Sequence, residues 1–318
     1  LIPVSDMTLT QLSYVVAVDR YRHFATAAEK SYVTQPTLSM QIHKLEDELD
    51  VTIFDRSKSP VIPTEIGEKI IEEAKQMLKQ AKHIEDLASL QEDELRGTFR
   101  IGIIHTVAPY LLPLFLRNFR QKYPDVKLVF EAVVTEELLH LLDQDYLDIG
   151  VIATPADRGN IFEEDLYYEP FMGYVSEDHP MASKERLTVE DLEVSNLWLL
   201  NEGHCFRDQT VKLCKKFRQD NIENNQIEFE SGNLENLKQL VEQNFGMTLL
   251  PYLAKNQIDE QCAKAHLRYF DDPVPRRKIR VVYGREYLKQ NIIEAFKKEV
   301  LDVIPDELRQ AEDGLLVE

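Results

Sequence analysis

Strand-like and helix-like patterns alternate from residue 99 to residue 300, and this alternation limits the possible folds more than any other feature. The first set is three apolar strands separated by two helices, expected at 99–104, 109–123, 127–134, 136–143 and 147–153. Strands joined through helices at this spacing pair in parallel with right-handed crossovers. The sequence therefore predicts an α/β fold for this part of the chain.

A second set of patterns follows and indicates a second lobe. Its strands and helices are expected at 167–176, 197–200, 207–219, 227–230, 234–243 and 248–251. A strand at 278–283 and a helix at 291–300 then return to the first lobe, so lobe I spans about 95–166 and 271–305 and lobe II about 167–270. Two such lobes enclose a cleft, the usual place for a ligand or a reactive group.

The N-terminal part of the chain has a different pattern. Residues 7–64 contain short helical patterns separated by turn residues, and residues 65–94 form one long helical pattern. Strands begin only after this helix, so the predicted domains are 7–64, 65–94 and 95–305. Residues 1–6 are interpreted as a vector remnant, with a native extension as the alternative.

The 318-residue chain carries a formal net charge of −19, and such acidity taken alone argues against nucleic acid as a partner. The charge is uneven, however, with −2 in 1–64, −5 in 65–94 and −12 in 95–318. A hydrophobic fraction of 43% excludes disorder, and three cysteines are too few for a disulfide framework, which indicates a reducing compartment. No apolar run approaches the roughly 20 residues that span a bilayer. Nucleic-acid binding therefore stays open for the nearly neutral first block.

The segment 34–49 predicts an amphipathic helix. Thr34 can cap its start, and Pro36 is tolerated in the first turn. The apolar face consists of Leu38, Ile42, Leu45 and Leu49. The opposite face offers hydrogen-bonding groups and a positive charge that suit base edges and phosphates, at Thr37, Ser39, Gln41 and Lys44.

An Ala-rich helix at 24–30 and a turn at 32–34 precede this segment, and together they predict a helix-turn-helix. Residues 55–63 predict a short hairpin wing, on which Arg56 and Lys58 can reach backbone phosphates. A small helical bundle with a polar exposed face is the alternative that the spacing leaves open.

Small and apolar residues recur along 65–94 at alternating four- and three-residue spacing, at Ile70, Ala74, Met77, Ala81, Ile84 and Ala88. This pattern is typical of a short coiled-coil seam. A second copy of the helix could pack against it, which would pair two DNA-reading units. The alternative is a single amphipathic helix that packs against its own domain.

Residues 8–67 resemble the winged helix-turn-helix of LysR-type transcriptional regulators. The resemblance rests on the motifs FATAA at 24–28, TQPTLS at 34–39, KLEDEL at 44–49 and FDR at 54–56. It implies DNA contacts in the recognition helix and wing, at Gln35, Pro36, Thr37, Ser39, Gln41, Lys44, Arg56 and Lys58. It also implies that 65–94 is a dimerising linker helix, that dimers pair into tetramers, and that about 95–300 adopts a periplasmic-binding-protein-like regulatory fold.

Cys205 has neighbours that favour thiol chemistry. Gly203 precedes it at the expected start of a helix, and Arg207 follows it. A helix N-terminus and a nearby cation both favour the thiolate, the form that attacks a peroxide. Asp208 could orient Arg207 or His204, or transfer a proton to a leaving hydroxide.

Cys214 lies nine positions after Cys205. If 206–217 is helical, a rise of about 1.5 Å per residue separates the cysteines by roughly 13 Å, whereas a disulfide needs Cα atoms within about 7 Å. A link between them therefore requires a change of conformation. Two unrelated cysteines remain the alternative, and a metal site would need a fourth ligand beside His204. Cys262 lies in a polar helical stretch and is interpreted as incidental.

The motif GHCFRDQ at 203–209, followed by Cys214, closely resembles the redox segment of peroxide-sensing LysR-type regulators. The motif TVAPYLLP at 106–113 does so too, and PRRKIRVVY at 275–283 matches more loosely. The resemblance implies that Cys205 is the peroxidatic cysteine and Cys214 the resolving one. It implies roles in peroxide binding and activation for Thr106, Thr135, His204, Arg207 and Asp208. The acidic tail at 306–318 departs from the pattern and has no assigned role.

The sequence thus predicts a cytoplasmic DNA-binding transcriptional regulator, not an enzyme, that activates oxidative-stress genes in response to hydrogen peroxide through a reversible Cys205–Cys214 disulfide. Expected partners are promoter DNA, hydrogen peroxide, further copies of the chain in a homodimer or homotetramer, RNA polymerase and a cellular thiol reductant. No cofactor, metal or membrane is expected. One alternative is a regulator with a small organic inducer in the cleft, which would still respond after Cys205→Ser. The other is a thiol peroxidase that turns over continuously.

Overall fold

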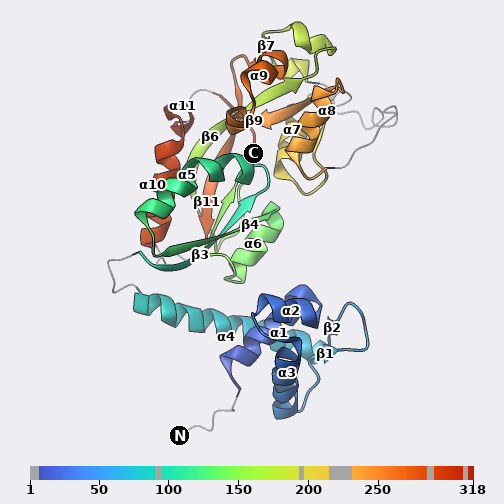
Figure 1. The fold of residues 1–318 in the computed structure, drawn as a ribbon, viewed down its shortest axis with the longest axis vertical. Coiled ribbons are helices and arrows are strands. Elements are labelled where there is room, and N and C mark those ends of the chain that lie inside the picture. Colours follow the sequence, from blue (N-terminus) through green and yellow to red (C-terminus); the bar gives the residue numbers. More distant parts are fainter. Residues whose placement is uncertain (1–6, 90–94, 193–196, 215–230, 285–289, 311–313) are drawn as a thin grey trace. The chain divides into compact units, whose positions relative to one another are not determined.

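The computed structural model of the protein describes residues 7–89, 95–192, 197–214, 231–284, 290–310 and 314–318. The chain forms two compact units, Leu1–Glu92 and Asp93–Glu318, and each unit is described by itself. The path of the chain is drawn in Figure 1. Among the described residues, no helix combines the length and the apolar character needed to cross a membrane.

The first unit is a small helical domain with a hairpin. Its elements are α1 (Leu9–Tyr21), α2 (Phe24–Lys30), α3 (Gln35–Leu49), β1 (Phe54–Asp55), β2 (Ile62–Pro63) and α4 (Glu65–Ser89). Thr34 caps α3 as predicted, because its side-chain oxygen accepts the N–H of Thr37, and Pro36 lies in the first turn. The predicted apolar residues Leu38, Ile42 and Leu45 are fully buried. Strands β1 and β2 pair antiparallel, so the predicted hairpin wing is present.

The apolar residues of helix α4 include both buried and exposed side chains. Ala74, expected on an exposed seam, is only 1% exposed, and the ion pair between Lys75 and Asp19 ties this part of α4 to α1. Met77 and Ile84, by contrast, are 44% and 69% exposed. The first half of the helix therefore packs against its own domain, and an apolar stripe remains uncovered among the described residues of this unit.

The second unit is built on one mixed sheet. Strands β3 (Gly97–Ile104), β4 (Val126–Val133) and β5 (Ile149–Ile152) pair in parallel with β3 between the other two. Helices α5 (Ala108–Lys122) and α6 (Thr135–Asp143) connect these strands, which confirms the predicted alternation. Parallel crossovers bring the loops after β3 and β4 to the same edge of the sheet.

Two long antiparallel strands, β6 (Phe162–Val175) and β11 (Pro275–Tyr283), carry the sheet from one lobe into the other (Figure 1). The strand order is β4-β3-β5-β11-β6-β10-β7, and β9 and β8 branch from β6. The remaining elements are η1 (Pro180–Ser183), β7 (Arg186–Leu187), η2 (Val189–Asp191), β8 (Leu197–Trp198), α7 (Cys205–Leu213), α8 (Leu234–Glu242), β9 (Met247–Pro251), η5 (Tyr252–Gln257), α9 (Glu260–His266), β10 (Leu267–Phe270) and α10 (Gln290–Val303). One buried apolar cluster runs through both lobes.

Two departures from the sequence prediction lie near the cysteines and in the tail. Helix α7 ends at Leu213 rather than at 219, and Cys214 adopts an extended backbone as its C-cap. The tail, for which no structure was predicted, forms α11 (Asp306–Arg309) and β12 (Leu315–Leu316), and β12 pairs in parallel with β11. Elements this short carry too few residues for a periodic pattern. The predicted strand at 227–230 lies outside the described residues.

Candidate functional site

The Cys205 site is assembled at the carboxyl ends of β3 and β4. Thr106 follows β3, and Thr135 is the first residue of α6, just after β4. Because β3 and β4 are parallel neighbours, the two threonines come to the same edge of the sheet. Cys205 is the first residue of α7, and its sulfur interacts with the Thr135 hydroxyl. Two helix N-termini, those of α6 and α7, therefore face the thiol, each with a partial positive charge.

The Thr135 hydroxyl has an unusual environment. Its oxygen is buried and makes no hydrogen bond of good geometry to any of the described residues. The hydroxyl nevertheless lies close enough to the Cys205 sulfur to lower the pKa of the thiol. Buried hydroxyls are normally satisfied, so this group is available to a small molecule bound beside the sulfur.

A buried ion pair supports the site. Arg277 of β11 lies opposite Glu169 of β6, and its Nη2 is 2.7 Å from Glu169 Oε2. Arg277 Nη1 also donates to Thr106 Oγ1 at 2.9 Å. The guanidinium carbon lies 4.9 Å from the centre of the Phe206 ring. A fixed positive charge therefore faces the first turn of α7.

Burial raises the pKa of Cys205 above its ordinary value and is the largest influence on the thiol. Arg277, the Thr135 hydroxyl and a backbone N–H oppose this effect, whereas the Asp208 carboxylate adds to it. The sequence identified a helix N-terminus and Arg207 as groups that favour the thiolate, but it did not give the direction of the pKa shift. In the structure desolvation outweighs the favourable contacts, and the cation that lowers the thiol pKa is Arg277 rather than Arg207.

The raised pKa of Cys205 leads to a pH prediction. Below its pKa, the thiolate fraction increases about tenfold per pH unit, so alkylation of Cys205 by iodoacetamide should still accelerate as the pH passes 9.0. The rate is measured in the reduced protein by mass spectrometry of the Cys205 peptide. Cys262→Ser serves as the control background. A rate that levels off near neutral pH would contradict the expected burial effect.

His204 is the N-cap of α7, but its side chain makes no capping hydrogen bond. The ring is buried and lies edge-on to His105, with ring centroids 5.3 Å apart. Burial, followed by the charge of His105, lowers the pKa of His204, which keeps the imidazole neutral near pH 7. Gly232 lies so close that a Cβ there would be 3.3 Å from His204 Nε2. A neutral imidazole held in this way is suited to accept a proton.

Arg207 and Asp208 lie at the rim of the site. Arg207 Nη1 is 3.7 Å from Asp208 Oδ1, and its Nη2 is 3.9 Å from Glu202 Oε1. Asp208 is exposed, and its contribution at Cys205 is to raise the thiol pKa. The structure thus places Thr135 beside the thiol, joins Thr106 to the Arg277 side chain that acts on it, and has His204 as the residue just before Cys205. Arg207 is partly exposed and Asp208 is exposed.

Cys214 lies at the opposite end of α7 from Cys205. Its side chain is buried, and burial raises its pKa to about 11. Both cysteines, and Cys262 on α9, are free thiols. The nine residues of α7 separate the two ends by roughly 13 Å at the helical rise. With this separation, a link between the two cysteines still requires the predicted change of conformation, by unwinding or by movement of the segment.

Sequence reasoning missed three residues of the site. Arg277, Glu169 and His105 were not predicted, although Arg277 lies in a strand whose alternate positions are apolar. Its neighbours Arg276 and Lys278 are also basic, so the sequence does not show which of the three basic residues is buried. Only the pairing of β6 with β11 distinguishes the buried arginine from its neighbours.

The candidate DNA-binding face lies on α3 and the wing. Gln35, Pro36, Thr37 and Lys44 are exposed, Ser39 and Gln41 are partly exposed, and Lys58 is exposed on the wing. Met40 is 62% exposed on the same face, and Tyr32 is 94% exposed in the preceding turn at φ 56°. Neither Met40 nor Tyr32 was predicted from the sequence.

Arg56, which was predicted to contact a DNA phosphate, makes contacts within the protein as well. Its Nη2 lies 2.6 Å from Glu46 Oε2, and its Nη1 donates to Ser39 Oγ at 3.3 Å. Glu46 is buried, and its other oxygen accepts the N–H groups of Ile53 and Phe54. No role was assigned to Glu46 within the sequence motif at 44–49. In the structure it is the group that fixes the start of the wing to α3.

The fold and site agree with a known family. The LysR substrate binding domain matches residues 92–305, and the bacterial regulatory helix-turn-helix of the lysR family matches residues 9–68. The chain therefore belongs to the LysR family of DNA-binding transcriptional regulators. This result confirms the predicted fold class of a helix-turn-helix followed by a two-lobed α/β regulatory domain.

Within the LysR family, the similar proteins and solved structures described next are OxyR proteins. The "DNA-binding transcriptional dual regulator OxyR" of Escherichia coli is 35% identical over 277 residues, which cover 87% of this chain and 89% of that protein. Full-length OxyR of Pseudomonas aeruginosa with one cysteine replaced by aspartate is 33% identical, has a TM-score of 0.75, and covers 96% of this chain and 98% of its own. An H2O2-bound cysteine mutant of Corynebacterium glutamicum OxyR is 32% identical, with a TM-score of 0.58 and coverage of 93% and 94%. The resemblance drawn from the redox segment is thus confirmed.

Proposed function

We propose that this regulator senses hydrogen peroxide through oxidation of Cys205 and a reversible Cys205–Cys214 disulfide, and that it activates oxidative-stress genes. The observation that carries the proposal is the placement of Cys205 at a helix N-terminus, beside Arg277 and beside the Thr135 hydroxyl, which makes no hydrogen bond of good geometry among the described residues. Relatives named "Hydrogen peroxide-inducible genes activator" support it.

The first chemical step would convert the thiol to a sulfenic acid. Cys205 sulfur attacks one oxygen of hydrogen peroxide, an S–O bond forms, and the O–O bond breaks. The thiol proton passes to the departing oxygen, which leaves as water. Thr106 and Thr135 would hold the peroxide and its water, and neutral His204 and Asp208 would pass the thiol proton to the departing oxygen. Arg207 would keep Asp208 in place through their ion pair.

The second step would form the disulfide. The Cys214 thiol attacks the sulfur of the sulfenic acid, an S–S bond forms, and the hydroxyl group leaves as a second water. Because Cys205 and Cys214 lie at opposite ends of α7, this helix must unwind first. The oxidised regulator would therefore differ in conformation from the reduced one, and a cellular thiol reductant would restore it.

The experiment is peroxide treatment of the full chain followed by mass spectrometry of unreduced peptides. A peptide pair linked through Cys205 and Cys214 is expected in the unmodified chain and in Cys262→Ser, and no such pair in Cys205→Ser. If the linkage never forms at any peroxide dose, the proposal fails. Sustained peroxide consumption with an added thiol reductant would instead favour a thiol peroxidase.

The proposed DNA interface is the exposed face of α3 with the wing. Its residues are Gln35, Pro36, Thr37, Ser39, Gln41, Lys44, Arg56 and Lys58. Short polar side chains on a capped helix suit base edges, and the lysines and arginine suit phosphates. The chain would bind promoter DNA in the cytoplasm and recruit RNA polymerase there. The boundaries 7–64, 65–94 and 95–305 are retained as the proposed domains.

Helix α4 is the proposed dimer contact. Its uncovered apolar stripe includes Ile66, Ile70, Met77 and Ile84. Seven-residue spacing from Ile70 to Met77 to Ile84 is that of a coiled-coil seam. Two recognition helices held together would compensate for the weak charge of each, and pairing of dimers would give a homotetramer.

Charging the seam should separate the subunits. Met77→Glu combined with Ile84→Glu is expected to dissociate the subunits, so that the molar mass of the particle in solution falls to that of a smaller oligomer or of the monomer. The reason is that an intact seam would have to bury two carboxylates per subunit against apolar side chains. Light scattering after size-exclusion chromatography measures the mass. Gln76→Glu, an exposed position on the same helix, is the matched control. An unchanged mass in the double variant would rule out this seam.

A further inference from the structure

The tail segment, residues 314–318, forms part of the sheet. The N–H groups of Leu315 and Val317 donate to the carbonyls of Val274 and Arg276, at 3.0 and 2.8 Å. The Val317 side chain is buried in the core cluster of the unit. This segment of the acidic tail, to which the sequence analysis assigned no role, therefore adds a short strand beside β11.

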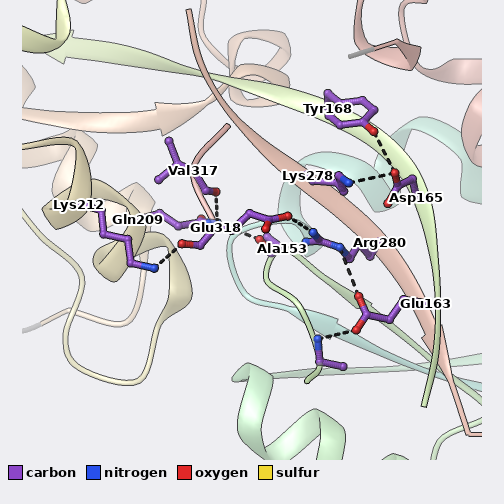
Figure 2. A network of polar contacts seen from close by, with 11 residues as sticks. Ala153, Glu163, Asp165, Tyr168, Gln209, Lys212, Lys278, Arg280, Val317 and Glu318 are labelled. Atoms are coloured by element: carbon purple, nitrogen blue, oxygen red, sulfur yellow. Dashed lines mark hydrogen bonds and ion pairs between the residues drawn. The ribbon is translucent and has the colours of Figure 1, made fainter. Parts of the chain in front are cut away.

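Helix α7 is bound to this tail segment (Figure 2). The buried side chain of Gln209 donates through Nε2 to Val317 O at 3.0 Å and to Ala153 O at 2.8 Å. Lys212 Nζ donates to Glu318 O. Gln209 and Lys212 are three residues apart, so they extend from the same face of the helix. That face of α7 therefore rests on main-chain carbonyls of the tail segment.

The tail segment is also fixed independently of α7. Arg280 of β11 pairs through Nη2 with the Glu318 carboxylate, and its Nε is 3.4 Å from Glu163 Oε2 (Figure 2). The Glu163 carboxylate in turn accepts the N–H of Ala156 at 2.8 Å. The main-chain oxygens of the tail segment that accept hydrogen bonds from Gln209 and Lys212 are thus held in place by the sheet.

We infer that the tail segment holds α7 in its helical position and so sets how readily the Cys205–Cys214 disulfide forms. The inference rests on the proposed function. Gln209 and Lys212 lie between the two cysteines along the chain, so the unwinding that joins the cysteines must detach both side chains from the tail segment. Contacts made only in the reduced form disfavour the oxidised form by the same factor that they stabilise the reduced one.

The polar network that joins α7, the tail segment and β11 contains buried groups without hydrogen-bond partners among the described residues, which limits how much it stabilises the reduced conformation. Gln209 Oε1 and Arg280 Nη1 are buried and have no hydrogen-bond partner within the described residues. A partly satisfied polar network stabilises its conformation less than a complete one. The tail segment therefore restrains α7 without making its unwinding prohibitive, as a reversible switch requires.

The test compares redox equilibria in the full chain. The unmodified protein, Lys212→Met, a chain lacking residues 314–318, and the combination of both changes are equilibrated with reduced and oxidised dithiothreitol at defined ratios. In this exchange the protein disulfide gains two electrons and becomes two thiols, while dithiothreitol is oxidised to its cyclic disulfide. Alkylation of free thiols and mass spectrometry give the fraction of Cys205–Cys214 disulfide. Lys264→Met, an exposed lysine near the end of α9, is the matched control.

Removal of residues 314–318 is expected to increase the ratio of disulfide to dithiol about tenfold, which moves the potential about 30 mV in the negative direction. Lys212→Met should produce a smaller increase in the intact chain and none in the shortened chain, whereas Lys264→Met should change nothing. Equal effects of Lys212→Met in both chains, or no effect of either change, would overturn the inference. If the unmodified chain forms no Cys205–Cys214 disulfide at any ratio, the proposed function itself fails. Should the shortened chain not fold, Lys212→Met against Lys264→Met decides: an equal disulfide ratio in the two overturns the inference.

Discussion

Replacing Arg277 with methionine is expected to slow the reaction of Cys205 with hydrogen peroxide about tenfold and to destabilise the regulatory unit by about 3–5 kcal/mol. The rate falls because Arg277 is the strongest group that lowers the pKa of the thiol against burial. The stability falls because Glu169 is left buried without its counter-ion. Single-turnover oxidation followed by mass spectrometry measures the rate, and urea unfolding of the reduced protein measures the stability.

Two further variants separate these effects. Arg277→Lys keeps the positive charge but not the forked geometry, so it should restore most of the rate and little of the stability. Arg277→Met combined with Glu169→Gln removes the unpaired carboxylate, so it should recover stability while Cys205 stays slow. A single Arg277→Met variant that reacts at the unmodified rate would show that another group activates Cys205.

Replacing Glu46 with alanine is expected to destabilise the first unit by about 2–3 kcal/mol and to weaken DNA binding by about tenfold or more. The change leaves the N–H groups of Ile53 and Phe54 without their acceptor and frees Arg56 from α3. The wing would then lose its fixed position relative to the recognition helix. Thermal unfolding and DNA titration at one stated salt concentration measure the two effects.

Glu48→Ala is the matched control for this prediction. Glu48 lies two residues further along α3 and is exposed, so its loss should leave stability nearly unchanged and, if anything, strengthen binding to a polyanion. If Glu46→Ala and Glu48→Ala behaved alike, the buried pair with Arg56 would have no structural importance.

The periodic parts of the fold were predictable from the sequence. Apolar alternation located β3, β4 and β5, and the spacing of Leu38, Ile42 and Leu45 located the buried face of α3. These features depend on local repeats, which a sequence displays directly. Thr34 at the start of α3 was recognisable for the same reason, because capping is a contact within one helical turn.

The groups that depend on pairing between distant segments could not be predicted in this way. Arg277 meets Glu169 because β6 and β11 align, and Glu46 reaches Arg56 across the turn before the wing. The direction of the pKa shift at Cys205 depends on burial, which the local sequence does not reveal. The motif around Cys205 thus pointed to the cysteine that is proposed to react, whereas its electrostatic surroundings required the fold.

Phe206, the residue after Cys205, has a consequence for how α7 would rearrange. Phe206 is buried, stacks on Phe171 with ring centroids 5.1 Å apart, and lies against the Arg277 guanidinium. The first turn of α7 is therefore anchored in the core, whereas its last turn ends at Cys214 in an extended cap. When the proposed disulfide forms, the displacement would therefore be unequal. Cys205 would stay near its position in the reduced protein, and Cys214 would move toward it.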